Sequence, residues 1–130
     1  MPAKVLVITD RPDLPQISTQ MLLLSGIEIS VQDDKIVTGE DTVIDLEFYD
    51  LVLINLYVRP GDSIALCQQL RTQYDNPILV MLPGQDEELV LRVYEAGADD
   101  CLVQPLGHRL LVAIINAWWR RARLSRADDS

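Results

Sequence analysis

Short apolar runs alternate with amphipathic segments along the whole chain, and this alternation strongly restricts the possible folds. Residues 5–8 and 78–82 are continuous aliphatic runs, as expected for strands buried on both faces of a sheet. Residues 27–31 alternate apolar and polar side chains, which is typical of a strand near a sheet edge. Segments with apolar residues at helical spacing separate these runs. The alternation therefore predicts βαβ units, a parallel sheet and helices on both of its faces.

Turn and cap residues set the limits of the other expected elements. Gly26 and Gly97 are expected to end helices, and Pro77 to separate a helix from the following strand. The remaining expected strands are 50–54 and 101–103, and the expected helices are 14–24, 66–74, 86–96 and 107–121, the last of which could continue further. A short helix at 39–46 is the weakest prediction, because residues 42–44 are β-branched.

Composition narrows the class of protein. A chain of 130 residues with 48% hydrophobic and 24% charged residues is expected to form one globular domain. Its net charge of -9 opposes binding to nucleic-acid phosphates. No apolar run approaches the roughly 20 residues that span a bilayer, and the N-terminus does not resemble a signal peptide, so we expect no membrane partner and a cytoplasmic location. Cys67 and Cys101 lack CxxC spacing; reduced thiols are the favoured interpretation, and one disulfide stays open.

Polar residues that follow the expected strands are the candidates for a functional site. Thr9 and Asp10 follow the first strand, and Asn55 follows the third. In open α/β sheets, ligands bind at the carboxyl ends of the strands. His108 is the only histidine and has no companion thiolates, so a surface or capping role is favoured over a base or metal ligand. No nucleophile and base pair is visible in the sequence, and we expect neither an enzyme nor a cofactor.

The segment Gly97-Ala98-Asp99-Asp100, followed by Pro105, resembles the receiver domain of bacterial two-component response regulators. Residues 49–54 and the pair Pro60-Gly61 also match that family in position, and the resemblance covers about residues 3–122. It implies an α/β, flavodoxin-like (βα)5 three-layer sandwich, with a five-stranded parallel sheet in the order 2-1-3-4-5. Residues 123–130 are then a tail or the start of a linker to an effector domain.

The resemblance also implies where phosphoryl chemistry takes place in the family, and this chain departs from the family there. The phosphoacceptor position is Asn55, and the acidic pair is Thr9-Asp10. The hydroxyl position is Pro83, the lysine position is Gln104, and the aromatic switch position is Cys101. An amide is a poor nucleophile, and one remaining carboxylate leaves Asp10 only a weak candidate for a metal ligand. The resemblance is therefore to an atypical or pseudo-receiver.

The role of Asn55 and Asp10 stays open at this level. Asn55 either holds neighbouring loops together, which is the favoured interpretation, or contacts a ligand. Asp10 either caps a helix, again favoured, or holds a weakly bound cation.

The resemblance to the winged-helix class implies homodimerisation through the fourth helix, fifth strand and fifth helix. The residues expected at this interface are Arg92, Glu95, Asp99, Asp100, Ile114, Trp118, Trp119, Arg120 and Arg121. Trp118 continues the apolar face of the last helix, whereas Trp119 is either covered by a partner or packed at the helix end.

Three hypotheses for function remain. The leading one is a non-phosphorylatable receiver that acts as a signalling and dimerisation module, with a role in transcription regulation. The second is a stand-alone adaptor that docks on another signalling protein. The third is a small-molecule sensor that uses the vacated acidic cleft between Asp10, Asn55 and Gln104.

Overall fold

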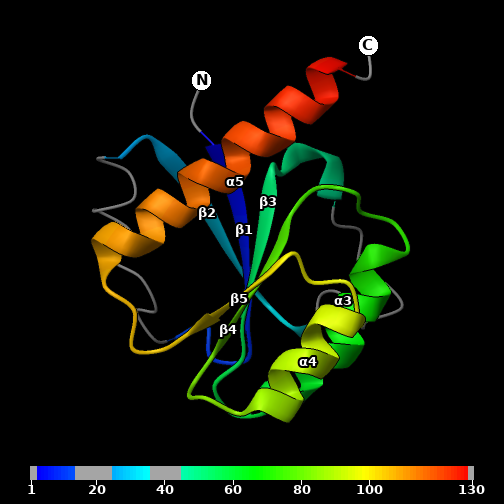
Figure 1. Ribbon diagram of the computed structural model, residues 1–130, viewed down its shortest axis with the longest axis vertical. Helices are drawn as coiled ribbons and strands as arrows, with labels where there is room; N and C mark the ends of the chain where they lie inside the picture. Colours follow the sequence, from blue (N-terminus) through cyan, green and yellow to red (C-terminus); the bar gives the residue numbers. More distant parts are fainter. Residues whose placement is uncertain (1–2, 14–24, 36–44, 129–130) are drawn as a thin grey trace.

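The computed structural model describes residues 3–13, 25–35 and 45–128, and its centre is a five-stranded parallel sheet (Figure 1). The strands are β1 (Ala3–Thr9), β2 (Ile27–Asp33), β3 (Leu51–Asn55), β4 (Ile78–Leu82) and β5 (Asp100–Val103). They are ordered β2-β1-β3-β4-β5, and every neighbouring pair is parallel. The predicted sheet and strand order are confirmed, and β2 lies at the expected edge. The expected helix at 14–24, and most of the one at 39–46, lie outside the described residues.

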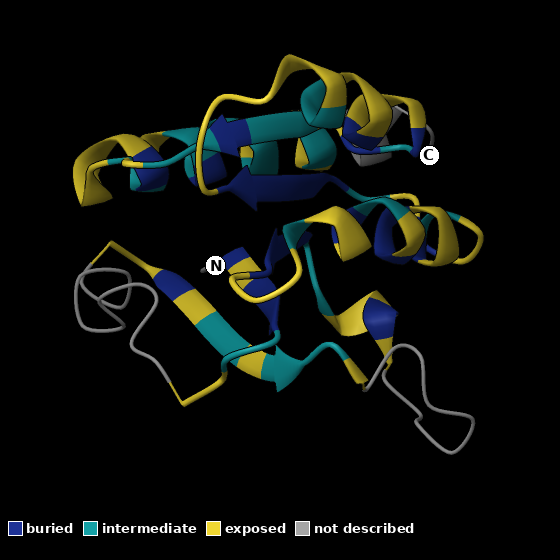
Figure 2. Ribbon diagram, turned by 90° about the horizontal axis from the view of Figure 1, so that it is seen from below, coloured by how far each residue is buried: buried dark blue, intermediate teal, exposed yellow. Residues whose placement is uncertain are grey.

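Helices pack on both faces of the sheet and make two apolar cores. The described helices are η1 (Leu46–Phe48), η2 (Pro60–Asp62), α3 (Ser63–Arg71), α4 (Glu87–Glu95) and α5 (His108–Asp128). Side chains from α3 and α4 pack on one face, and those from α5 pack on the other. Figure 2 shows buried strands between helices whose outer sides are exposed. No described helix, α5 included, is long and apolar enough to cross a membrane.

The burial of each strand follows from its place in the sheet. Every residue of the central strands β3 and β4 is buried, which explains the aliphatic runs that make up β4 and all of β3 except Asn55. The edge strand β2 is only partly buried, in keeping with its mixed sequence. On α5, Leu111 and Ile115 are buried, and Ile114 and Trp118 pack against the same core. The predicted core face of this helix is therefore confirmed.

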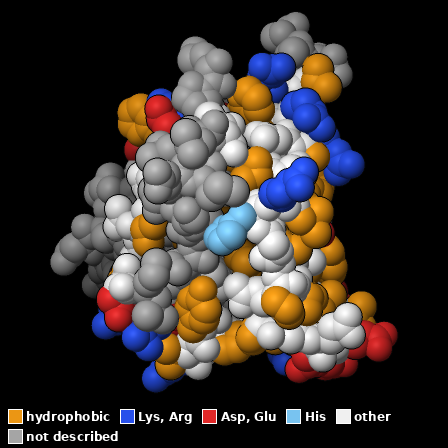
Figure 3. Space-filling model, turned by 90° about the vertical axis from the view of Figure 1, so that its left-hand side faces the viewer, with side chains coloured by type: hydrophobic (Ala, Val, Ile, Leu, Met, Phe, Trp, Pro, Cys, Tyr) orange, Lys and Arg blue, Asp and Glu red, His pale blue; other side chains and the backbone are white. Residues whose placement is uncertain are grey.

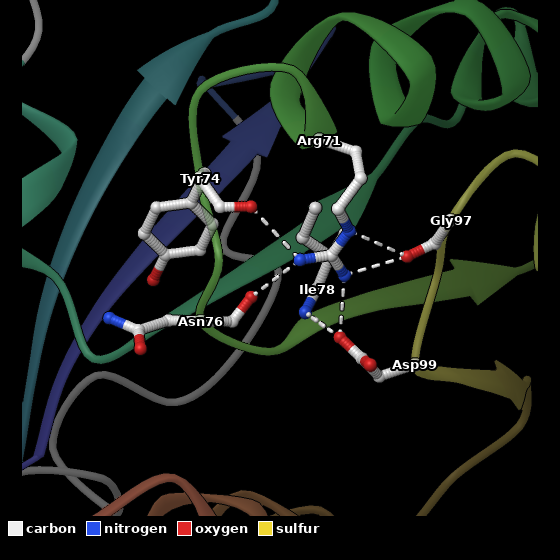
Figure 4. A network of polar contacts seen from close by, with 6 residues as sticks. All are labelled: Arg71, Tyr74, Asn76, Ile78, Gly97 and Asp99. Carbon is white, nitrogen blue, oxygen red and sulfur yellow. Dashed lines mark hydrogen bonds and ion pairs between the residues drawn. The ribbon is translucent and has the colours of Figure 1, made fainter. Parts of the chain in front are cut away.

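The end of α3 differs from the prediction, and Arg71, its last residue, contacts the loop that follows. The helix ends at Arg71, so Tyr74 packs into the core from the following loop and is not part of the helix. The Arg71 guanidinium donates from Nη1 to the carbonyl oxygens of Tyr74 and Asn76, at 3.0 and 3.1 Å. These contacts hold the loop of Tyr74 and Asn76 against the end of the helix (Figure 4).

The same guanidinium also holds the turn between α4 and β5. Arg71 donates from Nε and Nη2 to the carbonyl oxygen of Gly97, and from Nη2 to the Asp99 carboxylate at 2.7 Å. Asp99 in turn accepts the backbone N–H of Ile78, the first residue of β4. Gly97 has φ +117°, and a Cβ there would lie 3.1 Å from Cγ of Arg71. Glycine is needed at this position both for its backbone conformation and for the close approach of Arg71.

Candidate functional site

The carboxyl ends of β1 and β3 bring three of the predicted site residues together. Thr9 is paired with Asn55 in the register of the sheet, and both side chains are buried. Asp10 follows Thr9 directly and is half-buried. The structure therefore places Thr9, Asp10 and Asn55 at one edge of the sheet, as the parallel arrangement predicts.

The Asp10 carboxylate is bound by the loop that follows β3. Its Oδ1 accepts the backbone N–H of Tyr57 at 2.8 Å, and its Oδ2 accepts those of Val58 and Arg59 at 2.8 and 3.0 Å. Three amide dipoles thus converge on one negative charge, an arrangement that stabilises an anion without any metal ion. Sequence reasoning missed this contact, because the two segments are more than 45 residues apart along the chain.

Asn55 and Thr9 are also engaged locally. The Asn55 amide donates from Nδ2 to the Tyr57 hydroxyl oxygen at 3.2 Å, so the tyrosine side chain folds back towards the strand end. Thr9 Oγ1 accepts the backbone N–H of Arg11 at 3.1 Å. Together with Asp10, these contacts connect the β1 end to the β3–α3 loop through groups of the chain itself.

The ends of β4 and β5 supply no hydroxyl and no cation to this edge. Pro83 is exposed immediately after β4, while Leu82, the last strand residue, is fully buried in the core beneath α3 and α4. Gln104 donates its backbone N–H to the Leu82 carbonyl oxygen at 2.9 Å, and its neutral side chain is half-buried. Pro83, at the position where the family is expected to carry a hydroxyl, has none, and neither does Leu82 before it.

Two further carboxylates, Asp33 and Asp34, lie at the end of β2 near Asp10. The backbone N–H of Asp34 donates to the Thr9 carbonyl oxygen. Burial raises the pKa of Asp34, and a hydrogen bond with Asp33 raises it further, whereas the Lys35 backbone N–H lowers the pKa of Asp33. Within residues 3–13, 25–35 and 45–128, no group of three or more His, Cys, Asp or Glu side chains is arranged to hold a metal ion.

A cavity of about 190 Å³ lies beside Asp34, Leu56 and the start of α3. Its described lining includes Leu56, Asp62 and Leu66, and none of Asp10, Asn55 or Gln104. It is smaller than the roughly 300–1,000 Å³ typical of small-molecule sites. The cavity therefore gives no support to a ligand site between those three residues.

The edge strand β5 is connected to α4 and α5 through Asp100. Its Oδ1 accepts the Tyr94 hydroxyl at 3.2 Å and the Cys101 backbone N–H at 2.9 Å, and its Oδ2 accepts Nε1 of Trp118 at 3.0 Å. The Tyr94 oxygen also accepts the Cys101 N–H at 3.1 Å. Asp100 therefore has partners on both helices that flank β5.

The two adjacent tryptophans are both half-buried, and each carries an arginine over its ring. The Arg121 guanidinium lies 4.8 Å from the Trp118 ring centre, and that of Arg123 lies 4.8 Å from Trp119. Residues 108–127 contain five arginines and no acidic residue, in a chain of net charge -9. Figure 3 shows a row of Lys and Arg side chains at the top right, where α5 ends.

His108, the first residue of α5, is exposed.

Both cysteines are free thiols in the structure. Burial raises the pKa of Cys67 to about 12 and that of Cys101 to about 11. Both groups are consequently protonated near neutral pH, which is the unreactive form of a thiol.

Comparison with known proteins identifies the family. The profile of the response regulator receiver domain matches residues 5–116. This chain belongs to the response regulator receiver domain family. It is 31% identical over 121 residues to the transcriptional regulatory protein SpaR of Bacillus subtilis, covering 93% of this chain and 54% of SpaR. It is 30% identical over 121 residues to ResD of the same species, covering 92% of this chain and 49% of ResD.

A solved structure gives the same family and fold. A two-component response regulator from Clostridium difficile superposes with a TM-score of 0.75 at 28% identity, covering 92% of this receiver domain and 97% of that chain. The receiver domain spans about half the length of the two curated relatives. Sequence reasoning did not single out Arg71 and Tyr94, whose side chains hydrogen-bond to the residues at the start of β5.

Proposed function

We propose that this receiver domain transmits signals through protein contacts and without phosphorylation of an aspartate. The observation that carries the proposal is the state of its strand-end site: Asn55 stands at the phosphoacceptor position, and the nearby Asp10 carboxylate is already bound by three backbone N–H groups. We expect Asp10 to bind magnesium weakly, because the ion would compete with those amides for the same carboxylate oxygens.

The missing groups act together in phosphoryl transfer. A carboxylate is needed as nucleophile, a cation must offset the transferred charge, and donors must bind the phosphoryl oxygens. Asn55 offers an amide and Gln104 a neutral side chain, while Leu82 and Pro83 have no hydroxyl. The domain therefore acts as a signalling module and does not transfer phosphate to itself.

The first prediction tests this directly with a small phosphodonor. Incubation with acetyl phosphate and Mg²⁺ is expected to leave the intact mass unchanged, because no carboxylate stands at position 55 and no lysine at position 104. Intact-mass spectrometry at neutral pH is the measurement. The variant Asn55→Asp is the matched comparison. We expect acetyl phosphate to phosphorylate it at least 100-fold more slowly than a receiver that has the lysine and the hydroxyl as well. An acid-labile adduct of phosphate mass on the wild type would overturn the proposal.

We also propose that the domain belongs to a transcription regulator and forms a homodimer through α4, β5 and α5. The names of SpaR and ResD describe transcriptional regulatory proteins, which supports this assignment of role. Exposed apolar side chains on α4 and α5, Leu91, Tyr94 and Leu110, support an interaction surface there. The proposed interface comprises Arg92, Glu95, Asp99, Asp100, Ile114, Trp118, Trp119, Arg120 and Arg121.

The second prediction concerns the assembly state. Multi-angle light scattering over a dilution series, with no phosphodonor present, is expected to give a mass near twice the 14.7 kDa of the chain at the higher concentrations. A mass of one chain at every concentration would contradict homodimerisation. The alternative would then be an adaptor that docks on another signalling protein through the arginine-rich end of α5, which has opposite charge to the rest of the domain.

A further inference from the structure

The cavity beside α3 combines apolar walls with acidic groups. Its described lining comprises Asp34, Leu56, Asp62, Ala65, Leu66 and Gln69. The last four of these occupy positions i, i+3, i+4 and i+7, so the cavity extends along one side of α3 for about two turns. Leu56 and Leu66 are both buried in the core, and their side chains give the cavity an apolar floor.

Two carboxylates line this cavity from different elements. Asp34 comes directly after β2, where its backbone N–H donates to the Thr9 carbonyl oxygen at 2.9 Å. Asp62 comes directly before the first residue of α3. Among the lining residues that the structure describes there is no lysine or arginine. The charges on the two sides of the cavity are therefore both negative.

The Asp62 carboxylate has no partner in the described part of the chain. Asp62 stands at the N-cap of α3, where an aspartate usually accepts a backbone N–H of the first turn. Here the side chain makes no capping hydrogen bond, and it forms no ion pair with any described residue. The carboxylate is consequently available to a group that enters the cavity.

The charge around Asp34 favours a cation in this position. Burial raises the pKa of Asp34, and the neighbouring Asp33 and Asp10 raise it further. A positive group beside Asp34 offsets both the burial and the like charges. The residues outside 108–127 carry a net charge of -14, because the whole chain has -9 and the five arginines of that segment contribute +5. An anionic ligand would be repelled from this side of the domain.

The volume and the walls indicate the kind of cation. Since a water molecule takes up about 30 Å³ of liquid, a cavity of about 190 Å³ holds a ligand of roughly six non-hydrogen atoms. An ammonium group has three N–H donors for carboxylate oxygens, and a short alkyl chain behind it covers the apolar floor. A bare metal ion would leave the apolar floor without a contact.

We propose that this cavity binds a small aliphatic amine, with its ammonium group between Asp34 and Asp62 and its alkyl chain along Leu56 and Leu66. The ligand connects the end of β2 to the start of α3, next to the loop that Asp10 holds. The inference goes beyond the proposed function, because it gives the domain a chemical input that does not use Asn55, and it does not depend on homodimerisation.

Three probes of the same length and different charge test the proposal on the 130-residue chain. These are n-butylamine, n-butanol and butyrate, followed by ¹H–¹⁵N nuclear magnetic resonance at neutral pH in about 0.15 M NaCl, which screens surface charges. The amine is expected to shift the amide signals of Asp62, Ala65, Leu66 and Gln69, with a dissociation constant on the order of 1–10 mM for so small a ligand. The alcohol is expected to bind at least tenfold more weakly, and butyrate to cause no shift.

Two variants test the location of the site. Asp62→Asn removes one charge and keeps the shape, and we expect it to raise the dissociation constant of the amine at least fivefold. Ala65→Leu fills the cavity from an exposed helix position, and we expect it to abolish saturable binding while leaving the fold intact. Asp75→Asn is the matched control: Asp75 is exposed beyond the other end of α3 and does not line the cavity, so no change is expected.

The outcomes separate this inference from the proposed function. Equal binding of butanol and butylamine would overturn the role of the carboxylates. Amine binding that survives both Asp62→Asn and Ala65→Leu would show unspecific attraction to the acidic surface and overturn the site. Neither result bears on signalling without phosphorylation. A phosphate adduct on the wild type would overturn that proposal and leave the amine site standing.

Discussion

Replacing Arg71 by methionine is expected to lower the free energy of unfolding by about 3 kcal/mol, one of the two largest effects anticipated for this domain. The guanidinium makes five donor contacts, with the carbonyl oxygens of Tyr74, Asn76 and Gly97 and with the Asp99 carboxylate. Methionine fills much of the same space but removes all five donor contacts, and Asp99 keeps the backbone N–H of Ile78. The loss affects the α3–β4 and α4–β5 connections together, because one planar group serves both.

Urea unfolding at a fixed protein concentration, followed by circular dichroism, measures this change. Arg59→Met is the matched control: the Arg59 side chain is exposed, and we expect a change within about 0.5 kcal/mol. Arg71→Lys separates charge from geometry, since an ammonium cannot reproduce the fork of donors, and most of the loss is expected to remain. If Arg71→Met and Arg59→Met destabilise equally, the network contributes nothing beyond a surface arginine.

The sheet was predictable because it depends on local pattern. Continuous aliphatic runs mark β3 and β4, which are buried on both faces, and the mixed run at 27–31 marks the edge strand β2. The strand order came from the resemblance to the receiver family, and the observed order agrees with it. Hydrophobic periodicity carries this information because each residue's burial follows from its own position in an element.

The polar contacts at the strand ends were not predictable in the same way. Asp10 was interpreted as a helix cap or a weak cation ligand, but its oxygens accept amides of Tyr57, Val58 and Arg59, which lie 47 to 49 residues away. No sequence pattern distinguishes a carboxylate that binds a distant loop from one that caps the next helix. The pairing follows only when β1 and β3 lie side by side, which brings the Asp10 loop and the β3–α3 loop together.

The extent of α3 illustrates a second limit. Leu66, Leu70 and Tyr74 have helical spacing, so the sequence predicts a helix that includes all three, but the helix ends at Arg71. Tyr74 is nevertheless buried, and its hydroxyl donates to the Tyr49 carbonyl oxygen at 2.8 Å. The periodicity correctly identified a core residue and gave it the wrong backbone conformation, because burial of Tyr74 does not require that it belong to the helix.

Replacing Asp10 by alanine is expected to release the β3–α3 loop and to lower the free energy of unfolding by about 2 kcal/mol. Three amide N–H groups, of Tyr57, Val58 and Arg59, lose the carboxylate that accepts their hydrogen bonds. Water can replace part of the interaction because this loop is exposed, which is why the expected cost is smaller than the full value of three charge-assisted hydrogen bonds. The substitution should destabilise the closed β3–α3 loop more than the fold as a whole.

Amide hydrogen exchange measured by nuclear magnetic resonance resolves that local effect. Exchange at Tyr57, Val58 and Arg59 is expected to accelerate at least tenfold in Asp10→Ala, while amides within β4 change only as much as global stability does. Asp13→Ala is the matched control, since Asp13 pairs with Arg11 at the surface and accepts none of the loop amides. Unchanged protection of the three loop amides in Asp10→Ala would mean that other contacts close the loop. In that case the Asp10 carboxylate would remain available to a cation, and only Asn55 and Gln104 would oppose phosphorylation at this site.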